Sequence, residues 1–212
     1  MNRIIILLSC LLSLSQAYCQ DTIVNKWNNG QISSKGRMVD GREWGLWQYW
    51  NKQGKLVQET EFKKGVVNGR SLIYFDNGNK NSESFFKNGL QDSTYTEWYD
   101  NGNVKILGTF KAGLKTGNWE FFRNDGKKEQ IQEFLGNDSV RLLSYWDLND
   151  VQTVVNGNGS YKSFHKNGNI ASKGEYLNGY KSGLWETYYD NNNLKTKGKY
   201  KDGKPVGEWI SL

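Results

Sequence analysis

The chain has 212 residues, of which 24 are glycine, one is proline and 14% are aromatic. This composition argues against a compact mixed fold and is typical of many short strands joined by tight turns. The formal net charge of +6 is a mild basic excess that solvated lysines explain, so it gives no indication of a nucleic-acid partner.

The first 19 residues read as a secretory signal peptide. Arg3 precedes an apolar stretch that is followed by small residues, which is the layout of a cleaved leader and is too short for a membrane span. Cleavage follows either Ala17 or Cys19. A lipid anchor on Cys10 is less favoured, because only five apolar residues stand upstream of it. We therefore expect a secreted or periplasmic protein.

The two cysteines, Cys10 and Cys19, both lie inside or beside this leader. The mature chain then has no disulfide framework and no thiolate metal site, and we expect it to use no metal and no cofactor. A short lead-in, 20–26, separates the leader from a repeat domain that we expect to span 27–212.

The repeat domain has a period of 24 residues. Glycines that fit turns recur at this interval at Gly30, Gly54, Gly78, Gly102 and Gly126, and the pattern resumes at Gly168. Seven units of 24 residues and one shorter unit of 18 account for the domain, which is irregular at about 135–164. Self-similarity at a fixed period predicts a repeat architecture.

Each unit reads as two strands. In NVKILGTF, the side chains of Val104, Ile106 and Phe110 share one face, and the aromatic segment NWEFF follows after a turn. Asn-Gly pairs, as at 77/78, are expected to join the units through tight turns in which both residues take a positive φ. The predicted fold class is all-β, an elongated single-layer antiparallel array of β-hairpins.

One column of the repeat holds small residues and another holds large rings. The small column contains Thr60, Ser84, Gly108, Gly174 and Gly198, and the other column runs Trp47, Ser71, Tyr95 and Trp119, then Trp185 and Trp209. We expect the large rings to pack over the small residues, because a single-layer sheet has no second layer in which to bury them.

The outline G-x-[FY]-x-x-G-x-x-x-G-x-W begins at Gly108, at Gly174 and at Gly198. With the Asp-Asn-Gly that follows it, this outline resembles the MORN repeat, in the variant form common in secreted bacterial proteins. The resemblance covers 27–212 apart from a weak stretch at roughly 135–158. It implies a hairpin array used for binding, scaffolding or dimerisation, with anionic-lipid binding proposed for some members and an antitoxin label given to some bacterial ones.

The sequence offers no acid, base and nucleophile at a meaningful spacing, so we expect no enzyme and no catalytic residue. The single histidine, His165, stands in a column of strand-end aromatic residues and is interpreted as a substitute for one. An enzyme built on the irregular stretch, with Asp138, Glu133 or His165 contributing, is the least favoured alternative.

Two rows of side chains form the candidate binding surface. Rings end successive units at Trp50, Tyr74, Trp98, Phe122, Trp146 and Tyr188, and lysines lie at turn ends at Lys64, Lys87, Lys111, Lys181 and Lys201. The rings either pack internally or give a row suited to a protein or a sugar chain. The lysines are either solvated or form a basic rim. Asp76, Asp100 and Asp190 are expected to cap the backbone of their own turns.

The sequence thus predicts a non-enzymatic, secreted or periplasmic repeat protein that acts as a protein-binding or scaffold surface. An antitoxin-like or immunity protein that neutralises a partner toxin is the alternative, and binding of anionic lipid or polysaccharide at the cell envelope is a lesser one. No nucleic-acid partner is expected for an exported protein. The last unit ends on EWISL, whose strand edge would allow a homodimer.

Overall fold

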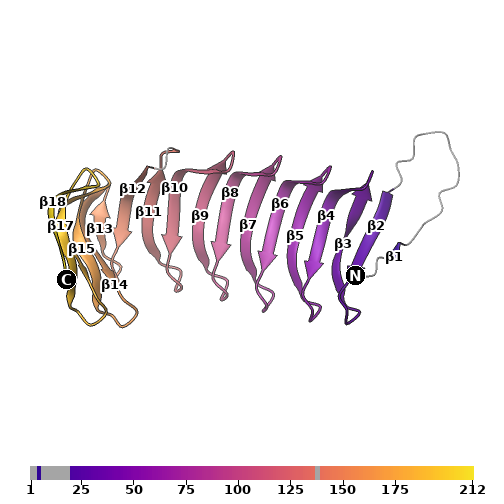
Figure 1. The fold of residues 1–212 in the computed structure, drawn as a ribbon, viewed down its shortest axis with the longest axis horizontal. Helices are drawn as coiled ribbons and strands as arrows, with labels where there is room; N and C mark the ends of the chain where they lie inside the picture. The colour runs from indigo at the N-terminus through magenta and orange to yellow at the C-terminus, as the bar shows by residue number, and fades with distance from the viewer. Residues whose placement is uncertain (1–3, 6–19, 137–138) are drawn as a thin grey trace. The chain divides into compact units, whose positions relative to one another are not determined.

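The computed structural model describes residues 4–5, 20–136 and 139–212, and within these ranges all regular secondary structure is β-strand. The predicted leader, 1–19, lies outside the described residues except for Ile4–Ile5. Two compact units form, Met1–Leu114 and Lys115–Leu212, and each is an antiparallel sheet of hairpins (Figure 1). The all-β prediction is confirmed.

In the first unit, each strand pairs antiparallel with the next one along the chain, from β1 to β9. The strands are β1 (Ile4–Ile5), β2 (Gln20–Lys26), β3 (Ile32–Val39), β4 (Arg42–Trp50), β5 (Leu56–Lys63), β6 (Val66–Tyr74), β7 (Lys80–Lys87), β8 (Leu90–Trp98) and β9 (Val104–Lys111). The hairpins β3–β4, β5–β6 and β7–β8 are three successive sequence repeats.

In the second unit the same order continues, again with consecutive strands paired antiparallel. The strands are β10 (Leu114–Phe122), whose first residue belongs to the first unit, β11 (Lys128–Phe134), β12 (Val140–Trp146), β13 (Gln152–Val155), β14 (Asn158–Phe164), β15 (Ile170–Leu177), β16 (Tyr180–Tyr188), β17 (Leu194–Lys201) and β18 (Lys204–Ser211). The short repeat is the hairpin β13–β14.

The shortened hairpin changes the contacts of its neighbours. The N–H of Leu142 on β12 donates to the carbonyl of Gly179, in the β15–β16 turn, at 3.0 Å. A small core of Leu142, Tyr145 and Val154 forms at this place. The missing residues of the short repeat therefore let a later turn reach β12, and this is why a conventional buried cluster appears here.

Two kinds of turn alternate along the chain. Inside a hairpin, Asp40 and Gly41 have φ values of 50° and 72°, so both central residues are left-handed, as in a type I′ turn. Between hairpins, only Gly78 of the Asn77–Gly78 pair has a positive φ. The prediction that both residues of the Asn-Gly pairs are left-handed is wrong, because Asn77 Oδ1 instead accepts the N–H of Asn79 at 2.9 Å. Turns of the first kind mark the tight-turn edge, and those of the second the wide-turn edge.

Neighbouring hairpins are tied together at both edges. At the tight-turn edge, backbone N–H groups donate to carbonyls of the preceding hairpin: Gly65 to Glu43 at 2.9 Å, Gly89 to Val67 at 2.8 Å and Gly113 to Gln91 at 2.7 Å. At the wide-turn edge, asparagine amides donate to carbonyls of the following turn: Asn29 to Lys52 at 2.8 Å, Asn77 to Asp100 at 2.8 Å and Asn167 to Asp190 at 2.7 Å. In these turns asparagine, not aspartate, is the capping side chain, so the capping role predicted for the aspartates is wrong.

Candidate functional site

Tryptophan rings lie directly on glycines of their own hairpins. A Cβ added to Gly36 would stand 2.1 Å from Cδ2 of Trp47, and one added to Gly174 would stand 2.3 Å from Cδ2 of Trp185. Each indole N–H donates to the carbonyl of the residue after the glycine, at 3.1 and 3.2 Å. The two rings are only 5% and 2% exposed. The predicted packing of rings over small residues is confirmed here, and the surface that carries it is called the tryptophan face.

Another repeat fills the same positions with hydroxyl groups. Thr60 stands where glycine does in β3, and Ser71 replaces the tryptophan. Their hydroxyl oxygens are 2.9 Å apart, and Gln58 Nε2 donates to Thr60 Oγ1 at 2.9 Å. Thr60 is buried, so this polar pair satisfies its own hydrogen bonds where β3–β4 and β15–β16 bury a ring.

In the second unit, five rings of the tryptophan face make a continuous row. Ring centroids are separated by 4.5 Å for Tyr145 and Tyr161, 5.7 Å for Tyr161 and Trp185, 6.0 Å for Trp185 and Tyr200, and 5.1 Å for Tyr200 and Trp209. Burial raises the pKa of Tyr145 to about 12. Aromatic pairs at these separations contribute about 0.5 to 1.5 kcal/mol each beyond area burial, so this row has a structural purpose.

Lysines cover two of the tryptophans. Nζ of Lys181 lies 4.2 Å from the centroid of Trp185 and 5.1 Å from that of Tyr200. Lys115 repeats the arrangement at 4.2 Å from Trp119. Burial lowers the pKa of Lys181. The structure therefore separates Lys181 from the other lysines of the predicted basic rim, because it lies over a ring of its own sheet.

The rings that end the units lie on the opposite face, called the polar face. All six predicted rings, Trp50, Tyr74, Trp98, Phe122, Trp146 and Tyr188, are half-buried. The hydroxyl of Tyr74 donates to Glu59 Oε2 at 2.6 Å, and burial together with this carboxylate raises the tyrosine pKa to about 12. Lys80 Nζ stands 5.4 Å from the centroid of Trp98. These contacts favour the internal-packing interpretation of the ring row.

A carboxylate network on the polar face joins three strands of the second unit. Glu186 on β16 accepts from Lys173 on β15 and Lys197 on β17, each at 2.9 Å, and from the Tyr188 hydroxyl at 2.8 Å. Lys173, followed by Lys197 and Tyr188, holds the pKa of Glu186 at about 2. The carboxylate is thus a cross-strand tie that stays ionised at neutral pH.

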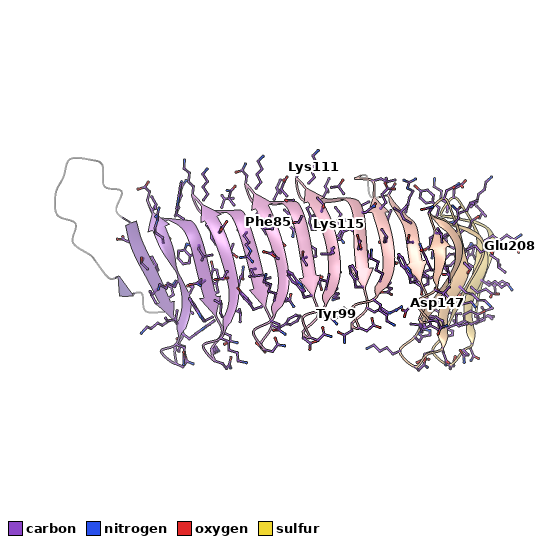
Figure 2. All side chains as sticks on the ribbon, turned by 180° about the vertical axis from the view of Figure 1, so that it is seen from behind. Phe85, Tyr99, Lys111, Lys115, Asp147 and Glu208 are labelled. Carbon is purple, nitrogen blue, oxygen red and sulfur yellow. The ribbon has the colours of Figure 1, made fainter. Side chains whose placement is uncertain are left out.

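The tight-turn edge of the first unit exposes three apolar side chains in succession. Val66, Leu90 and Leu114, the apolar stripe, are 45%, 53% and 59% exposed. Each begins the second strand of its hairpin, and Val66 Cγ1 would lie 3.3 Å from a Cβ on Gly89 of the next turn. Lys111 projects from this same edge (Figure 2). Sequence reasoning missed the stripe, although the three residues recur at the 24-residue period.

At the wide-turn edge, the side chain that begins several of the units hydrogen-bonds to the backbone at the end of the same unit. Trp27 Nε1 donates to the carbonyl of the last residue of its unit at 3.0 Å, and the Tyr189 hydroxyl does so at 3.1 Å. His165 Nε2 makes the same contact at 2.9 Å. The interpretation of His165 as a substitute for a strand-end ring is therefore confirmed. Tyr99 lies at this edge, opposite Lys111 (Figure 2).

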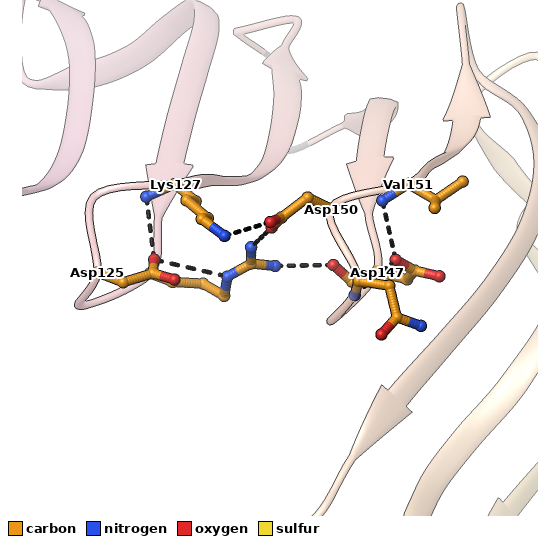
Figure 3. Close-up of polar contacts among 7 residues, drawn as sticks. Asp125, Lys127, Asp147, Asp150 and Val151 are labelled. Carbon is orange, nitrogen blue, oxygen red and sulfur yellow. Dashed lines mark hydrogen bonds and ion pairs between the residues drawn. The ribbon is translucent and has the colours of Figure 1, made fainter.

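In the unit that begins at Arg123, an arginine occupies this position. Arg123 Nη1 donates to the carbonyl of Asp147 at 2.8 Å, and Asp150 pairs with both Arg123 and Lys127 (Figure 3). Lys127 first, and Arg123 second, lower the pKa of Asp150. Asp125 stands 3.7 Å from Arg123 Nε. This cluster holds two wide turns together, with its charges balanced locally.

Of the residues considered for catalysis, Glu133 and His165 each contact another part of the sheet. Glu133 Oε2 accepts from Arg141 Nε at 2.9 Å, His165 contacts a backbone carbonyl, and Asp138 lies outside the described residues. Within 4–5, 20–136 and 139–212, no group of three or more His, Cys, Asp or Glu side chains could hold a metal ion. In the same ranges, no helical segment has the length and apolar character of a membrane span.

Comparison with known proteins identifies the repeat. A family model described as MORN repeat variant matches 45–64, 67–88, 91–112, 158–178 and 181–202, together just over half of the chain. No curated protein matches at a significant level. Among solved structures, a porin-like protein from Bacteroides uniformis ATCC 8492 matches with 10% identity over 92% of this chain and 91% of that chain, at a TM-score of 0.26. A TM-score this low carries no argument about the present chain.

Proposed function

Because this chain belongs to the family of MORN repeat variants, we propose that it is a non-enzymatic repeat protein that presents a binding surface to a protein partner. Repeat arrays provide extended surfaces whose side chains recur in register. The ties at both edges give such a surface a fixed spacing, since turns at either edge are hydrogen-bonded to the neighbouring hairpin.

The observation that carries the proposal is the apolar stripe. The corresponding position in other repeats holds Arg42, Tyr180 and Lys204, so the fold accepts charged and polar residues there. Three exposed apolar residues in succession are therefore not required by folding. Exposed apolar side chains that line up in this way are typical of interaction surfaces.

Export of the protein is part of the proposal. The charged start, apolar centre and small residues of 1–19 support a cleaved leader, so the partner would be an envelope or extracellular protein. A non-enzymatic role is supported by the carboxylates on the polar face, of which Glu59 and Glu186 are held by hydrogen bonds within the sheet.

Affinity purification from the protein's own cell envelope tests this function. The full chain with a carboxyl-terminal tag would be expressed in its own host, cross-linked, purified and analysed by mass spectrometry. The test variant changes the stripe to serine, as Val66→Ser, Leu90→Ser and Leu114→Ser. The matched control changes three other exposed leucines to serine, as Leu46→Ser, Leu148→Ser and Leu184→Ser.

We expect the wild-type and control proteins to recover the same partner and the stripe variant to lose it. Recovery of no reproducible partner, or equal recovery by all three proteins, would contradict the proposal. Thermal unfolding of the three proteins, followed by circular dichroism, shows whether a loss of binding comes from loss of folding.

A further inference from the structure

Each step of the apolar stripe is accompanied by a lysine. Lys63 is the cross-strand partner of Val66, and Lys87 is the partner of Leu90. Lys111 and Leu114 flank the next tight turn in the same way along the sequence. Directly opposed residues of antiparallel strands project from the same face. The tight-turn edge of the first unit therefore repeats a pair of one apolar and one cationic side chain.

The lysines of these pairs are available to a partner. Lys63, Lys87 and Lys111 are exposed, and among the residues that the structure describes none of them forms an ion pair. Two carboxylates at this edge accept backbone N–H groups: Glu61 accepts the N–H of Arg70 at 2.9 Å, and Asp92 accepts that of Ala112 at 3.2 Å. A partner that covers the stripe would therefore meet lysines that form no ion pair within the described residues.

The spacing of the pairs restricts the shape of the partner. Successive pairs are two strands apart, or about 9.6 Å. Two turns of an α-helix advance about 10.5 Å over seven residues and return a side chain to the same face. An extended strand advances about 10 Å in three residues, which places that side chain on its opposite face. A helix with one apolar residue in every heptad matches the stripe, and a strand does not.

We propose that the tight-turn edge of the first unit binds an acidic amphipathic helix of the partner. This inference rests on the proposed function and names the chemistry of its partner. The helix places one apolar side chain per heptad on Val66, Leu90 and Leu114. Carboxylates next to these apolar residues pair with Lys63, Lys87 and Lys111.

A bilayer with anionic lipids would also meet lysines and apolar groups, but the stripe suits it poorly. Helices that lie in a membrane interface bury a broad apolar face. The stripe is a single file of aliphatic side chains, each with a lysine across its tight turn. Vesicle binding is therefore an outcome of the test that would count against a helical partner.

Fluorescence anisotropy with a designed peptide tests the proposal directly. The probe is a labelled helical peptide of about 21 residues with leucine at every seventh position and glutamate beside each leucine. A scrambled peptide of the same composition is the control. The full chain is measured at low and at high salt, because charge-assisted binding weakens with ionic strength.

We expect the probe to bind more tightly than the scrambled peptide by about tenfold or more. The stripe-to-serine variant should lose this advantage. The charge reversal Lys63→Glu, Lys87→Glu and Lys111→Glu should also lose it, and should bind a probe in which lysine replaces the glutamates. Binding of the charge-swapped probe would show that the reversed protein is folded. It would also show that binding depends on the pairing of opposite charges.

Three results would overturn the proposal: equal binding of the probe and the scrambled peptide, tighter binding of a proline-rich peptide with an apolar residue at every third position, or stripe-dependent sedimentation with phosphatidylglycerol vesicles in place of peptide binding. The proposed function fails separately. Envelope purification could recover a partner in a stripe-dependent way while no helical probe binds. In that case the proposed binding function would be supported and the proposed helical partner would be rejected.

Discussion

Two neighbouring hairpins of the first unit, β3–β4 and β5–β6, fill the same two positions of the repeat with different side chains. In the first, the ring of Trp47 covers the bare backbone of Gly36. In the second, Thr60 and Ser71 hold each other through their hydroxyl groups at 2.9 Å. The register shift moves by one residue between them: it lies between Lys35 and Arg37 in the first hairpin and between Thr60 and Phe62 in the second.

The repeat therefore accepts different residue types at these two positions, provided that the two side chains suit each other. The Trp47 ring fits over Gly36 because glycine has no Cβ: an added Cβ would lie 2.1 Å from Trp47 Cδ2. In the second hairpin, the Thr60 hydroxyl is instead satisfied by the Ser71 hydroxyl. In these two hairpins, the residue at one position suits the residue at the other.

Removing a ring should have the largest effect. Trp185→Ala deletes a side chain that is 2% exposed and is expected to lower the free energy of unfolding by about 3 to 5 kcal/mol. Urea unfolding followed by circular dichroism measures the loss. Trp209→Ala removes the same residue type where it is 36% exposed, and should cost clearly less. Equal losses for the two variants would show that ring burial does not stabilise the hairpins.

Filling the space under a ring should have the next largest effect. Gly36→Val would force the Trp47 ring away from the backbone, at a cost of about 1 to 3 kcal/mol. Lys35→Val, on the other face of the same strand, is the matched control. Gly108→Val, in the same column, is predicted to behave like Gly36→Val. An unchanged urea midpoint for Gly36→Val would contradict the packing of ring on glycine.

The array could be predicted from the sequence because it repeats. The 24-residue period and the alternation of Val104, Ile106 and Phe110 are local patterns, and they fix strands and hairpins without knowledge of long-range contacts. The pairing of rings with small residues also follows from the columns, since a thin sheet has only its own backbone on which to bury a ring.

The turns and the candidate surface were harder to predict for a physical reason. The Asn-Gly pairs fit the sequence preference of a type I′ turn, but the amide of Asn77 can instead bind the backbone two residues on and the carbonyl of Asp100 in the next repeat. Only the next repeat decides between these options. The exposure of Val66 and Leu90 likewise depends on how closely the adjacent turn approaches, which composition does not reveal.

Replacing the Thr60–Ser71 pair by glycine and tryptophan tests whether the two positions are coupled. Thr60→Gly alone leaves the Ser71 hydroxyl without its partner, and Ser71→Trp alone drives a ring against the Thr60 side chain. The double variant rebuilds the pair seen in β3–β4. We expect each single variant to lose about 1 to 2 kcal/mol and the double variant to regain most of it. Additive losses in the double-mutant cycle would mean that the two positions are not coupled.

The polar face should give the smallest effect, and one that depends on pH. Glu186 occupies the position of Leu72 in β6, and its partners hold its pKa at about 2, against an ordinary value of 4.5. A lowered carboxyl pKa stabilises the folded state above the unfolded value, so this stability is present above about pH 4.5 and is lost as pH falls towards 2. Because solvent screens Lys173 and Lys197, the contribution is on the order of 1 kcal/mol or less. The melting temperature of Glu186→Gln should therefore fall less than that of the wild type between pH 5 and pH 2, and parallel curves would show that the network adds nothing to stability.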